Sequence, residues 1–394
     1  MIVGVAAESA PGEQRVALVP SVISTLTKLG VDVLVEAGAG DAAGFPDAEY
    51  TEQGARIAVS RDEVIEAADI FARVRAPGAD PDHGDAGLAK LRSGQIVIGL
   101  LDPLGDTDAV QALAGTGVSS FALELLPRIT RAQAMDVLSS QATVAGYKAV
   151  VKAADMLNRM YPLMMTAAGT ITPAHVLVVG AGVAGLQAIA TARRLGAVVE
   201  AYDVRPAARE QVESLGARFA ELELDTADAE GAGGYAEALG DDFYRRQGEL
   251  MAQLVAGSDI VITTAAVPGV RAPVLISADA VRGMRVGSVI IDLAAETGGN
   301  CELTSTGETI EAHGVTIVGS VHLATEIPYD ASQMYARNVA AFLGNLIEDG
   351  AVNLNLEDEI IRDTLLTHAG EVAAERVRGA LDLTTAEPAT EERE

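Results

Sequence analysis

The chain has 394 residues, of which 49% are hydrophobic and 21% charged, so it is long enough for roughly two or three domains with cores of their own. Its formal net charge of −28 argues against nucleic acid or an anionic membrane surface as a partner, because both would repel it. A single cysteine, Cys301, excludes an internal disulfide, and five histidines without ligand spacing predict no metal site.

The N-terminal stretch lacks the basic start and apolar core of a signal peptide. The most apolar stretch, 176–192, is broken by glycines and contains Gln187. A membrane helix needs about 20 apolar residues, so we expect no direct membrane insertion. Any role at a membrane must then come through a partner.

Residues 1–138 alternate between apolar runs of β type and helical patterns, such as 20–29 before Gly30. Strands that are separated by helices predict βαβ units and a mostly parallel sheet. The segment 76–87 reads as loop. The apolar runs are 2–7, 31–36, 70–74, 95–101 and 118–122.

Residues 139–160 predict one long helix that connects two domains. A second α/β domain follows, with strands at 259–264, 288–293 and 315–318, and the helical pattern 330–346 is expected to complete the first domain. The expected domains are 1–138 plus 328–380, 139–327, and a polar, disordered tail at 381–394.

The segment 176–205 has the pattern of a dinucleotide-binding unit. Residues 176–179 predict a buried strand, the turn GAGVAG at 180–185 opens a helix to about residue 195, and a second strand, 197–202, ends in Asp203. A glycine-rich turn in an ordinary α/β domain is the alternative.

Each glycine in this turn has a physical task. Gly180 makes the tight turn, Gly182 lets a pyrophosphate approach the backbone, and Gly185 lets the helix pack closely on the strand. The helix N-terminus offers free N–H groups to the phosphates. Asp203 is placed for the adenosine ribose hydroxyls and would repel a 2′-phosphate, so NAD(H) is favoured although Arg205 follows.

Four polar residues precede the long helix, and they are Arg128, Gln133, Asp136 and Ser139. They could bind a carboxamide or a ribose, or they could form a capped, hydrogen-bonded helix start. The residues alone leave both interpretations open.

The acidic stretch 220–239 interrupts the β–α alternation and contains a glycine-rich hinge beside Tyr235. It predicts a mobile lid over bound nucleotide, with a solvated loop of no function as the alternative.

Five motifs together resemble the NAD(H)-binding domain, or separate alpha subunit, of the proton-translocating NAD(P) transhydrogenases. The similarity covers residues 1 to about 355. The motifs are PRITRAQAMD at 127–136, MMTAAGT at 164–170, GAGVAGLQAIATAR at 180–193, GGY at 233–235 and GSVIIDL at 287–293.

The resemblance implies two Rossmann-like, doubly wound parallel-sheet domains, the first discontinuous, with a cofactor cleft between them. It implies hydride transfer of the Re/Si-specific type from NADH to NADP on a partner subunit, while a membrane proton-channel subunit moves protons. The chain ends without membrane helices, which resembles the split form. A homodimer on the cytoplasmic side of the inner (plasma) membrane, bound through partner subunits, is also implied.

The resemblance also implies the binding residues. Arg128, Gln133, Asp136 and Ser139 would hold the nicotinamide end and be the catalytic set. The Gly180–Gly185 turn, through Ala181, Gly182 and Val183, would contact the pyrophosphate. Asp203, Val204 and Arg205 would contact the adenosine ribose. The rest of the cleft would be lined by Gly234, Tyr235, Thr264, Ala265 and Ala266.

An NAD-dependent alanine dehydrogenase is the alternative enzyme, because that family is expected to share the fold. Glu13 and Arg15 resemble its substrate-arginine region. However, Arg75 replaces its substrate lysine, residues 98–102 contain no histidine, and Glu296 replaces its aspartate. Oxidative deamination needs a base of suitable pKa, so these differences favour the transhydrogenase. A regulatory NAD-sensing module is a third possibility.

Overall fold

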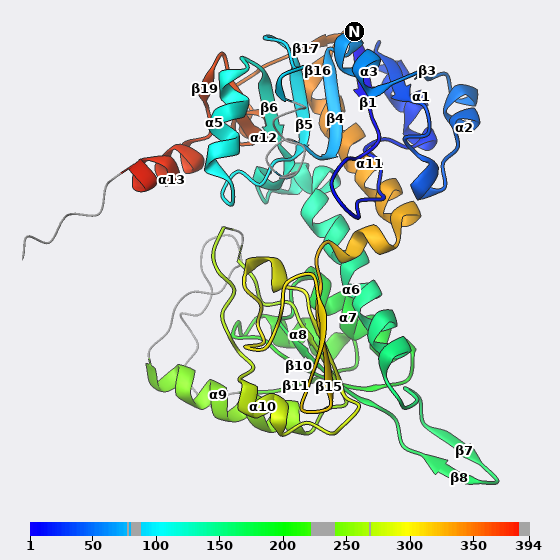
Figure 1. The fold of residues 1–394 in the computed structure, drawn as a ribbon, viewed down its shortest axis with the longest axis vertical. Helices are drawn as coiled ribbons and strands as arrows, with labels where there is room; N and C mark the ends of the chain where they lie inside the picture. Colours follow the sequence, from blue (N-terminus) through cyan, green and yellow to red (C-terminus); the bar gives the residue numbers. More distant parts are fainter. Residues whose placement is uncertain (77–78, 80–87, 222–240, 268, 386–394) are drawn as a thin grey trace, which may run out of the picture. The chain divides into compact units, whose positions relative to one another are not determined.

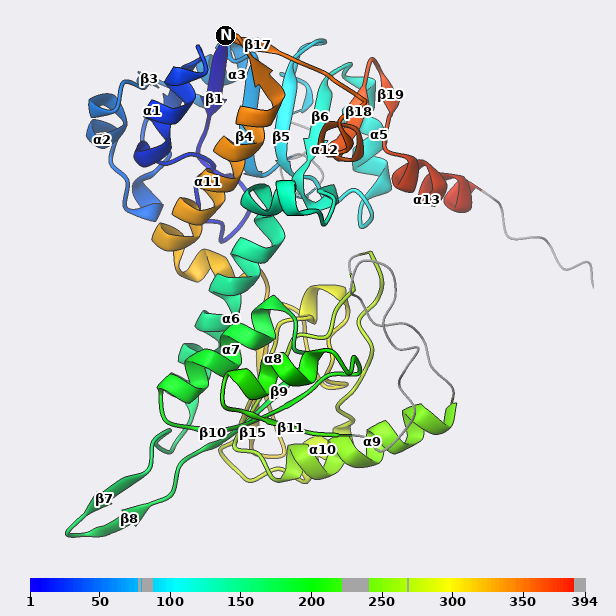
Figure 2. The same ribbon diagram turned by 180° about the vertical axis from the view of Figure 1, so that it is seen from behind.

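The computed structural model describes residues 1–76, 79, 88–221, 241–267 and 269–385. It divides into two compact units (Figures 1 and 2). Unit 1 comprises Met1–Gln141 and Ile327–Glu394, and unit 2 comprises Ala142–Glu326. No helix in these described ranges is long and apolar enough to cross a membrane.

Unit 1 contains an eight-stranded sheet in the order β19-β18-β6-β5-β4-β1-β2-β3. Strands β1 to β6 pair in parallel, whereas β18 and β19 add an antiparallel edge. The mostly parallel sheet predicted from the alternation is thereby confirmed. The strands are β1 (Ile2–Val5), β2 (Asp32–Glu36), β3 (Arg56–Ala58), β4 (Ile70–Arg75), β5 (Ile96–Leu100), β6 (Ser119–Ala122), β18 (Leu365–His368) and β19 (Glu371–Val372).

Both faces of this sheet are covered. Ile96 and Ile98 of β5 belong to one buried cluster, and Val97 between them belongs to another, because successive side chains of a strand point to opposite faces. On the first face, Phe342 packs edge-to-face on Phe121. The helices are α1 (Pro20–Lys28), α2 (Asp47–Glu52), α3 (Arg61–Ala67), α5 (Thr107–Gly115), α11 (Pro328–Leu346), α12 (Glu359–Thr364) and α13 (Glu375–Thr385).

The expectation of a disordered tail from residue 381 is wrong for residues 381–385. Helix α13 continues to Thr385, because Val377 is buried in the cluster beneath it and Leu381 packs against the same cluster. Residues 386–394 lie outside the described residues, as does most of the predicted loop 76–87.

Unit 2 contains a seven-stranded sheet in the order β11-β10-β9-β12-β13-β15-β14, parallel except for β14 at its edge. The alternate residues of β9 again enter two different buried clusters, which is the doubly wound arrangement. The strands are β9 (His175–Val179), β10 (Val198–Tyr202), β11 (Arg218–Phe219), β12 (Ile260–Thr263), β13 (Val289–Asp292), β14 (Thr309–Ala312) and β15 (Val315–Gly319).

Four helices of unit 2 are α7 (Val183–Arg194), α8 (Ala208–Ser214), α9 (Asp241–Ala256) and α10 (Ala278–Arg282). The long helix predicted at 139–160 is α6, which spans Val137–Met156 and contains the division between the units. It ends earlier than expected, and Arg159 beyond it donates to Asp259 Oδ1 at 2.8 Å.

A two-stranded hairpin, β7 (Met164–Thr166) and β8 (Gly169–Ile171), extends from unit 2 (Figure 1). The motif MMTAAGT did not predict it as a hairpin. Met165 is 77% exposed, and Leu163 and Ile171 are also exposed.

Glu124 is a buried acid at the end of β6 in unit 1. Its Oε1 accepts the N–H groups of Leu101 and Asp102, each at 2.7 Å, and its Oε2 has no partner among the described residues. Burial raises the pKa of Glu124 to about 7 against the opposing effect of these hydrogen bonds, and the nearby Asp102 raises it further.

Glu124→Gln should therefore stabilise the chain above neutral pH. Because the folded pKa exceeds the unfolded value of 4.5, the stability that Glu124 contributes is complete below 4.5 and is lost as the pH rises through about 7. The variant should gain about 3 kcal/mol relative to wild type at about pH 8.5 and little at about pH 4. Urea unfolding followed by circular dichroism measures this, with exposed Glu357→Gln as control. A gain that does not change with pH would contradict the assignment.

Candidate functional site

The turn between β9 and α7 leaves no room for side chains at two of its glycines. Gly180 has φ +97°, in the left-handed region that favours glycine, and a Cβ there would lie 2.6 Å from Thr264 Oγ1. A Cβ at Gly185 would overlap the carbonyl oxygen of Gly180. The first turn of α7 therefore lies directly against the end of β9.

Gly182 lies on the open side of this turn. It is exposed, and a Cβ added to it would meet no atom within 4 Å. It is followed by Val183, which begins α7, and the first N–H groups of a helix have no acceptor within the helix. These groups and the positive end of the helix dipole fit an anionic group such as a pyrophosphate.

Ala181 has a different environment from the one its neighbours suggest. It is buried, and its N–H donates to Asp203 Oδ2 at 2.7 Å. The turn is thus held from within by the carboxylate at the end of β10. The sequence predicted Asp203 as a ribose ligand and did not predict this bond.

Asp203 also pairs with Arg205. Its Oδ1 accepts the backbone N–H and Nε–H of Arg205, both at 2.9 Å, and its Oδ2 accepts Nη2–H at 2.8 Å. The guanidinium therefore compensates the charge of the carboxylate. Repulsion of a 2′-phosphate by Asp203 is weaker than the sequence argument assumed. Val204 between them packs against the apolar cluster of that face.

The end of β12 reaches the same turn. Thr264 Oγ1 donates to the carbonyl oxygen of Gly180 at 3.0 Å, and the Ala265 N–H donates to Asn300 Oδ1 at 3.0 Å. Ala266 next to it is exposed. Gly234, Tyr235 and nearly all of the predicted lid at 220–239 lie outside the described residues.

Helix α6 contacts the dinucleotide turn at a glycine that sequence patterns did not indicate. A Cβ at Gly146 would overlap the carbonyl oxygen of Ala184, in the first turn of α7. Any side chain at position 146 would push the two helices apart.

The predicted polar cluster of unit 1 contains a helix cap. Asp136 Oδ1 accepts the Ser139 N–H at 2.9 Å, and its Oδ2 accepts the Ser139 hydroxyl at 2.5 Å, at the start of α6. Arg128 and Gln133 are exposed. A cap does not exclude a ligand, so the binding role of all four residues stays a prediction.

The segment that carries this cluster is anchored by a pair that the sequence did not indicate. Arg131 Nη1 donates to Asp358 Oδ2 at 2.9 Å, its Nη2 donates to Oδ1 at 2.5 Å, and Asn345 Nδ2 donates to Oδ2 at 3.0 Å. These bonds, that of Arg131 foremost, hold the pKa of Asp358 well below its usual range. Asn338 Nδ2 also donates to the Ala134 carbonyl at 2.8 Å, so α11 supports the segment as well.

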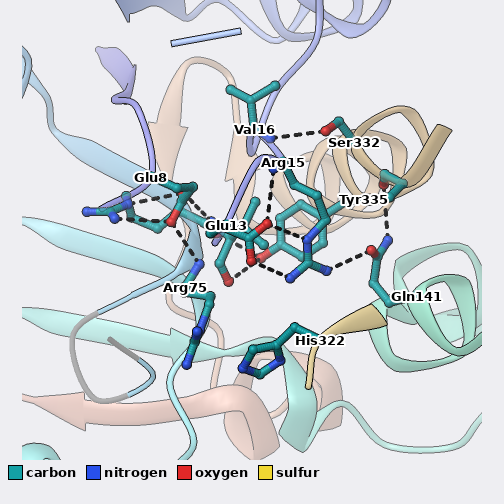
Figure 3. A network of polar contacts seen from close by, with 12 residues as sticks. Glu8, Glu13, Arg15, Val16, Arg75, Gln141, His322, Ser332 and Tyr335 are labelled. Atoms are coloured by element: carbon teal, nitrogen blue, oxygen red, sulfur yellow. Dashed lines mark hydrogen bonds and ion pairs between the residues drawn. The ribbon is translucent and has the colours of Figure 1, made fainter. Parts of the chain in front are cut away.

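The region compared with the alanine dehydrogenases contains buried arginines whose charge is already compensated. Figure 3 shows Arg15 bonded to Glu13 and Gln141. Arg15 Nε and Nη2 donate to the two oxygens of Glu13 at 2.8 and 2.7 Å, and Nη1 donates to Gln141 Oε1 at 2.8 Å. Arg73 pairs in the same way with Glu8. A substrate carboxylate would therefore meet a guanidinium that Glu13 already engages.

The remaining alanine-dehydrogenase positions also differ. Glu296, in unit 2, accepts both the backbone N–H and Nδ1 of His322 at 2.6 and 3.0 Å. Across the ranges that the structure describes, no group of His, Cys, Asp and Glu side chains could hold a metal ion.

Comparison with known proteins shows where these features belong. The chain matches the alanine dehydrogenase/PNT N-terminal domain over residues 4–145 and the C-terminal domain of the same family over residues 149–375. It is 44% identical over 382 residues to the first of the separate chains that form NAD(P) transhydrogenase subunit alpha in Rhodospirillum rubrum, covering 96% of this chain and 99% of that protein.

A solved structure of transhydrogenase from Sinorhizobium meliloti is similar, with a TM-score of 0.84 and 47% identity over 94% of this chain and 100% of that one. Alanine dehydrogenase of Mycobacterium tuberculosis is more distant, at 28% identity over 397 residues, or 99% of both chains. The chain therefore belongs to the alanine dehydrogenase/PNT family, among the NAD(P) transhydrogenase alpha subunits.

Proposed function

We propose that the chain is the NAD(H)-binding subunit of a proton-translocating NAD(P) transhydrogenase of the Re/Si-specific type. The observation that carries the proposal is the open Gly182 turn at the start of α7, held beside the Asp203 carboxylate. This is the pairing of a pyrophosphate site with a ribose ligand that dinucleotide binding requires. Kinship with transhydrogenase alpha subunits supports the same conclusion.

The residues of unit 2 would hold the adenosine and pyrophosphate parts of NADH. Gly182 and Val183 would donate to the pyrophosphate, and the segment 203–205 would bind the adenosine ribose. Thr264, Ala265 and Ala266 would line the remaining cofactor surface. In unit 1, we assign the nicotinamide end to Arg128, Gln133, Asp136 and Ser139.

NADH, when bound, supplies a hydride for NADP on the partner subunit. Direct transfer needs reacting atoms about 3–3.5 Å apart and exclusion of water, and no protein group has to move a proton. The assigned residues of this chain accordingly bind and orient, through backbone N–H groups, hydroxyls and an amide. Proton movement would belong to the membrane partner.

The partners are an NADP(H)-binding subunit and a membrane proton-channel subunit, so the chain would act from the cytoplasmic face of the inner membrane. We also propose a homodimer. The exposed Leu163, Met165 and Ile171 at the β7–β8 hairpin supply apolar surface that a second copy could cover. Sedimentation velocity of the purified chain decides this, and a monomer at all concentrations would reject it.

Asp203→Asn should weaken NADH binding by about 1–3 kcal/mol, the scale of a lost charge-assisted hydrogen bond. Wild type should bind NADH more tightly than NADPH, and the variant should narrow this difference because Arg205 loses its partner. Fluorescence titration of both nucleotides measures the affinities. Asp155→Asn on α6 makes the same charge change at an exposed position and should leave them unaltered. Equal wild-type affinities for NADH and NADPH would contradict the assignment.

Gln133→Ala should slow hydride transfer much more than it weakens NADH binding. Gln133 would orient the nicotinamide, and a displacement of about 1 Å in a reacting group costs roughly a hundredfold in rate. The purified chain, mixed with an NADP-binding partner subunit, gives the transfer rate, and titration gives the dissociation constant. Exposed Gln53→Ala is the matched control in unit 1. If both quantities change by the same factor, Gln133 does not orient the ring, and no transfer by wild type would reject the proposed function.

Alanine should not be oxidised by the chain with NAD. Residues 98–102 contain no histidine, and Arg15 is already paired with Glu13. A steady-state assay at high alanine in alkaline buffer, with an alanine dehydrogenase as positive control, checks this. Sustained NADH formation would restore the dehydrogenase alternative.

A further inference from the structure

Two buried polar residues follow β13 and have no place in the predicted binding set. Asp292 and Asn300 are both 0% exposed. Asp292 Oδ1 accepts from the Thr263 hydroxyl at 2.8 Å and the Ala294 N–H at 3.0 Å. Its Oδ2 accepts from the Asn300 N–H at 2.8 Å and the Thr304 hydroxyl at 2.7 Å. One carboxylate thus joins the ends of β12 and β13 to the loop that follows.

The side chain of Asn300 binds the backbone of Ala265 at two points. Its Oδ1 accepts the Ala265 N–H at 3.0 Å, and its Nδ2 donates to the Ala265 carbonyl at 2.8 Å. Nδ2 also donates to the Pro273 carbonyl at 2.9 Å. Only a side-chain amide donates and accepts in this way, so neither aspartate nor leucine could replace it.

This contact acts on a backbone segment that has no regular structure of its own. Strand β12 ends at Thr263, and residues 264–267 after it form neither helix nor strand. Thr264 is bonded to the Gly180 carbonyl on one side, and Ala265 is bonded to Asn300 on the other. The bonds therefore run from Asp292 through Asn300 to the dinucleotide turn.

We propose that Asn300 is a positioning residue for NAD(H): it fixes the backbone of Ala265 and Ala266 against the nucleotide, and Asp292 holds Asn300 in place. This inference rests on the proposed function. Asn300 itself does not touch the nucleotide. Its effect is to keep the Ala265 segment in its binding conformation before the ligand arrives, which lowers the cost of binding.

Asn300→Asp tests the proposal with almost no change in volume. Aspartate retains an acceptor for the Ala265 N–H and loses both donated bonds. The dissociation constant for NADH should rise about tenfold, the effect of one to two lost hydrogen bonds. Backbone amides at 264–266 should exchange faster in hydrogen-exchange mass spectrometry of the free chain.

Thr304→Val is the matched control, because it removes a different donor to Asp292 and leaves the Ala265 contacts in place. Both variants should melt at lower temperature, but Thr304→Val should keep the NADH dissociation constant within about twofold. Equal weakening of binding in both variants, in proportion to their melting temperatures, would show that Asn300 is merely structural and overturn the proposal.

Asn300→Ser, which removes the two-point contact without adding a charge, serves if the aspartate variant does not fold. It should show the same rise in the dissociation constant, and unchanged NADH affinity would overturn the proposal. If wild type itself does not bind NADH, the proposed function fails together with this inference. If wild type binds and the Asn300 variants bind equally well, only this inference fails.

Discussion

The absence of a side chain at Gly185 is the constraint on which the candidate site depends. A Cβ there would overlap the Gly180 carbonyl, so any other residue would lift α7 away from the end of β9. That displacement would break the Thr264 bond to the same carbonyl and move Ala181 away from Asp203. The ends of β9, β10 and β12 therefore form one edge only because residue 185 is glycine.

Carboxylates do most of the shaping in this strongly acidic chain. Asp203 holds the turn, Asp292 the loop after β13, Asp136 the start of α6 and Asp358 the segment before it. Each accepts several donors, and buried acceptors need such donors to offset desolvation. The Asp203 charge is compensated by Arg205, so the turn can present its free N–H groups to an anionic nucleotide.

The relationship to the alanine dehydrogenases illustrates how a shared fold leaves the chemistry to a few side chains. Arg15 is present in the buried network, but it is neutralised by Glu13. Glu124 contacts the end of the segment 98–102 and has a raised pKa, although no motif indicated its position at the end of β6. Its Oε1 is committed to two backbone N–H groups. The network stabilises unit 1 rather than presenting a free base.

The sequence by itself determined the two parallel sheets, the dinucleotide turn and the strand that ends in Asp203. Those features follow from local periodicity and from glycine sterics, which act over neighbouring residues. The tertiary structure alone decided the antiparallel edge β18–β19, the helical residues 381–385 and the bonds that fix the site. Ala265 and Asn300 are 35 positions apart and Arg131 and Asp358 are 227 apart. A bond between a side chain and a distant backbone leaves no periodic trace, because it depends on which segments the folded chain brings together.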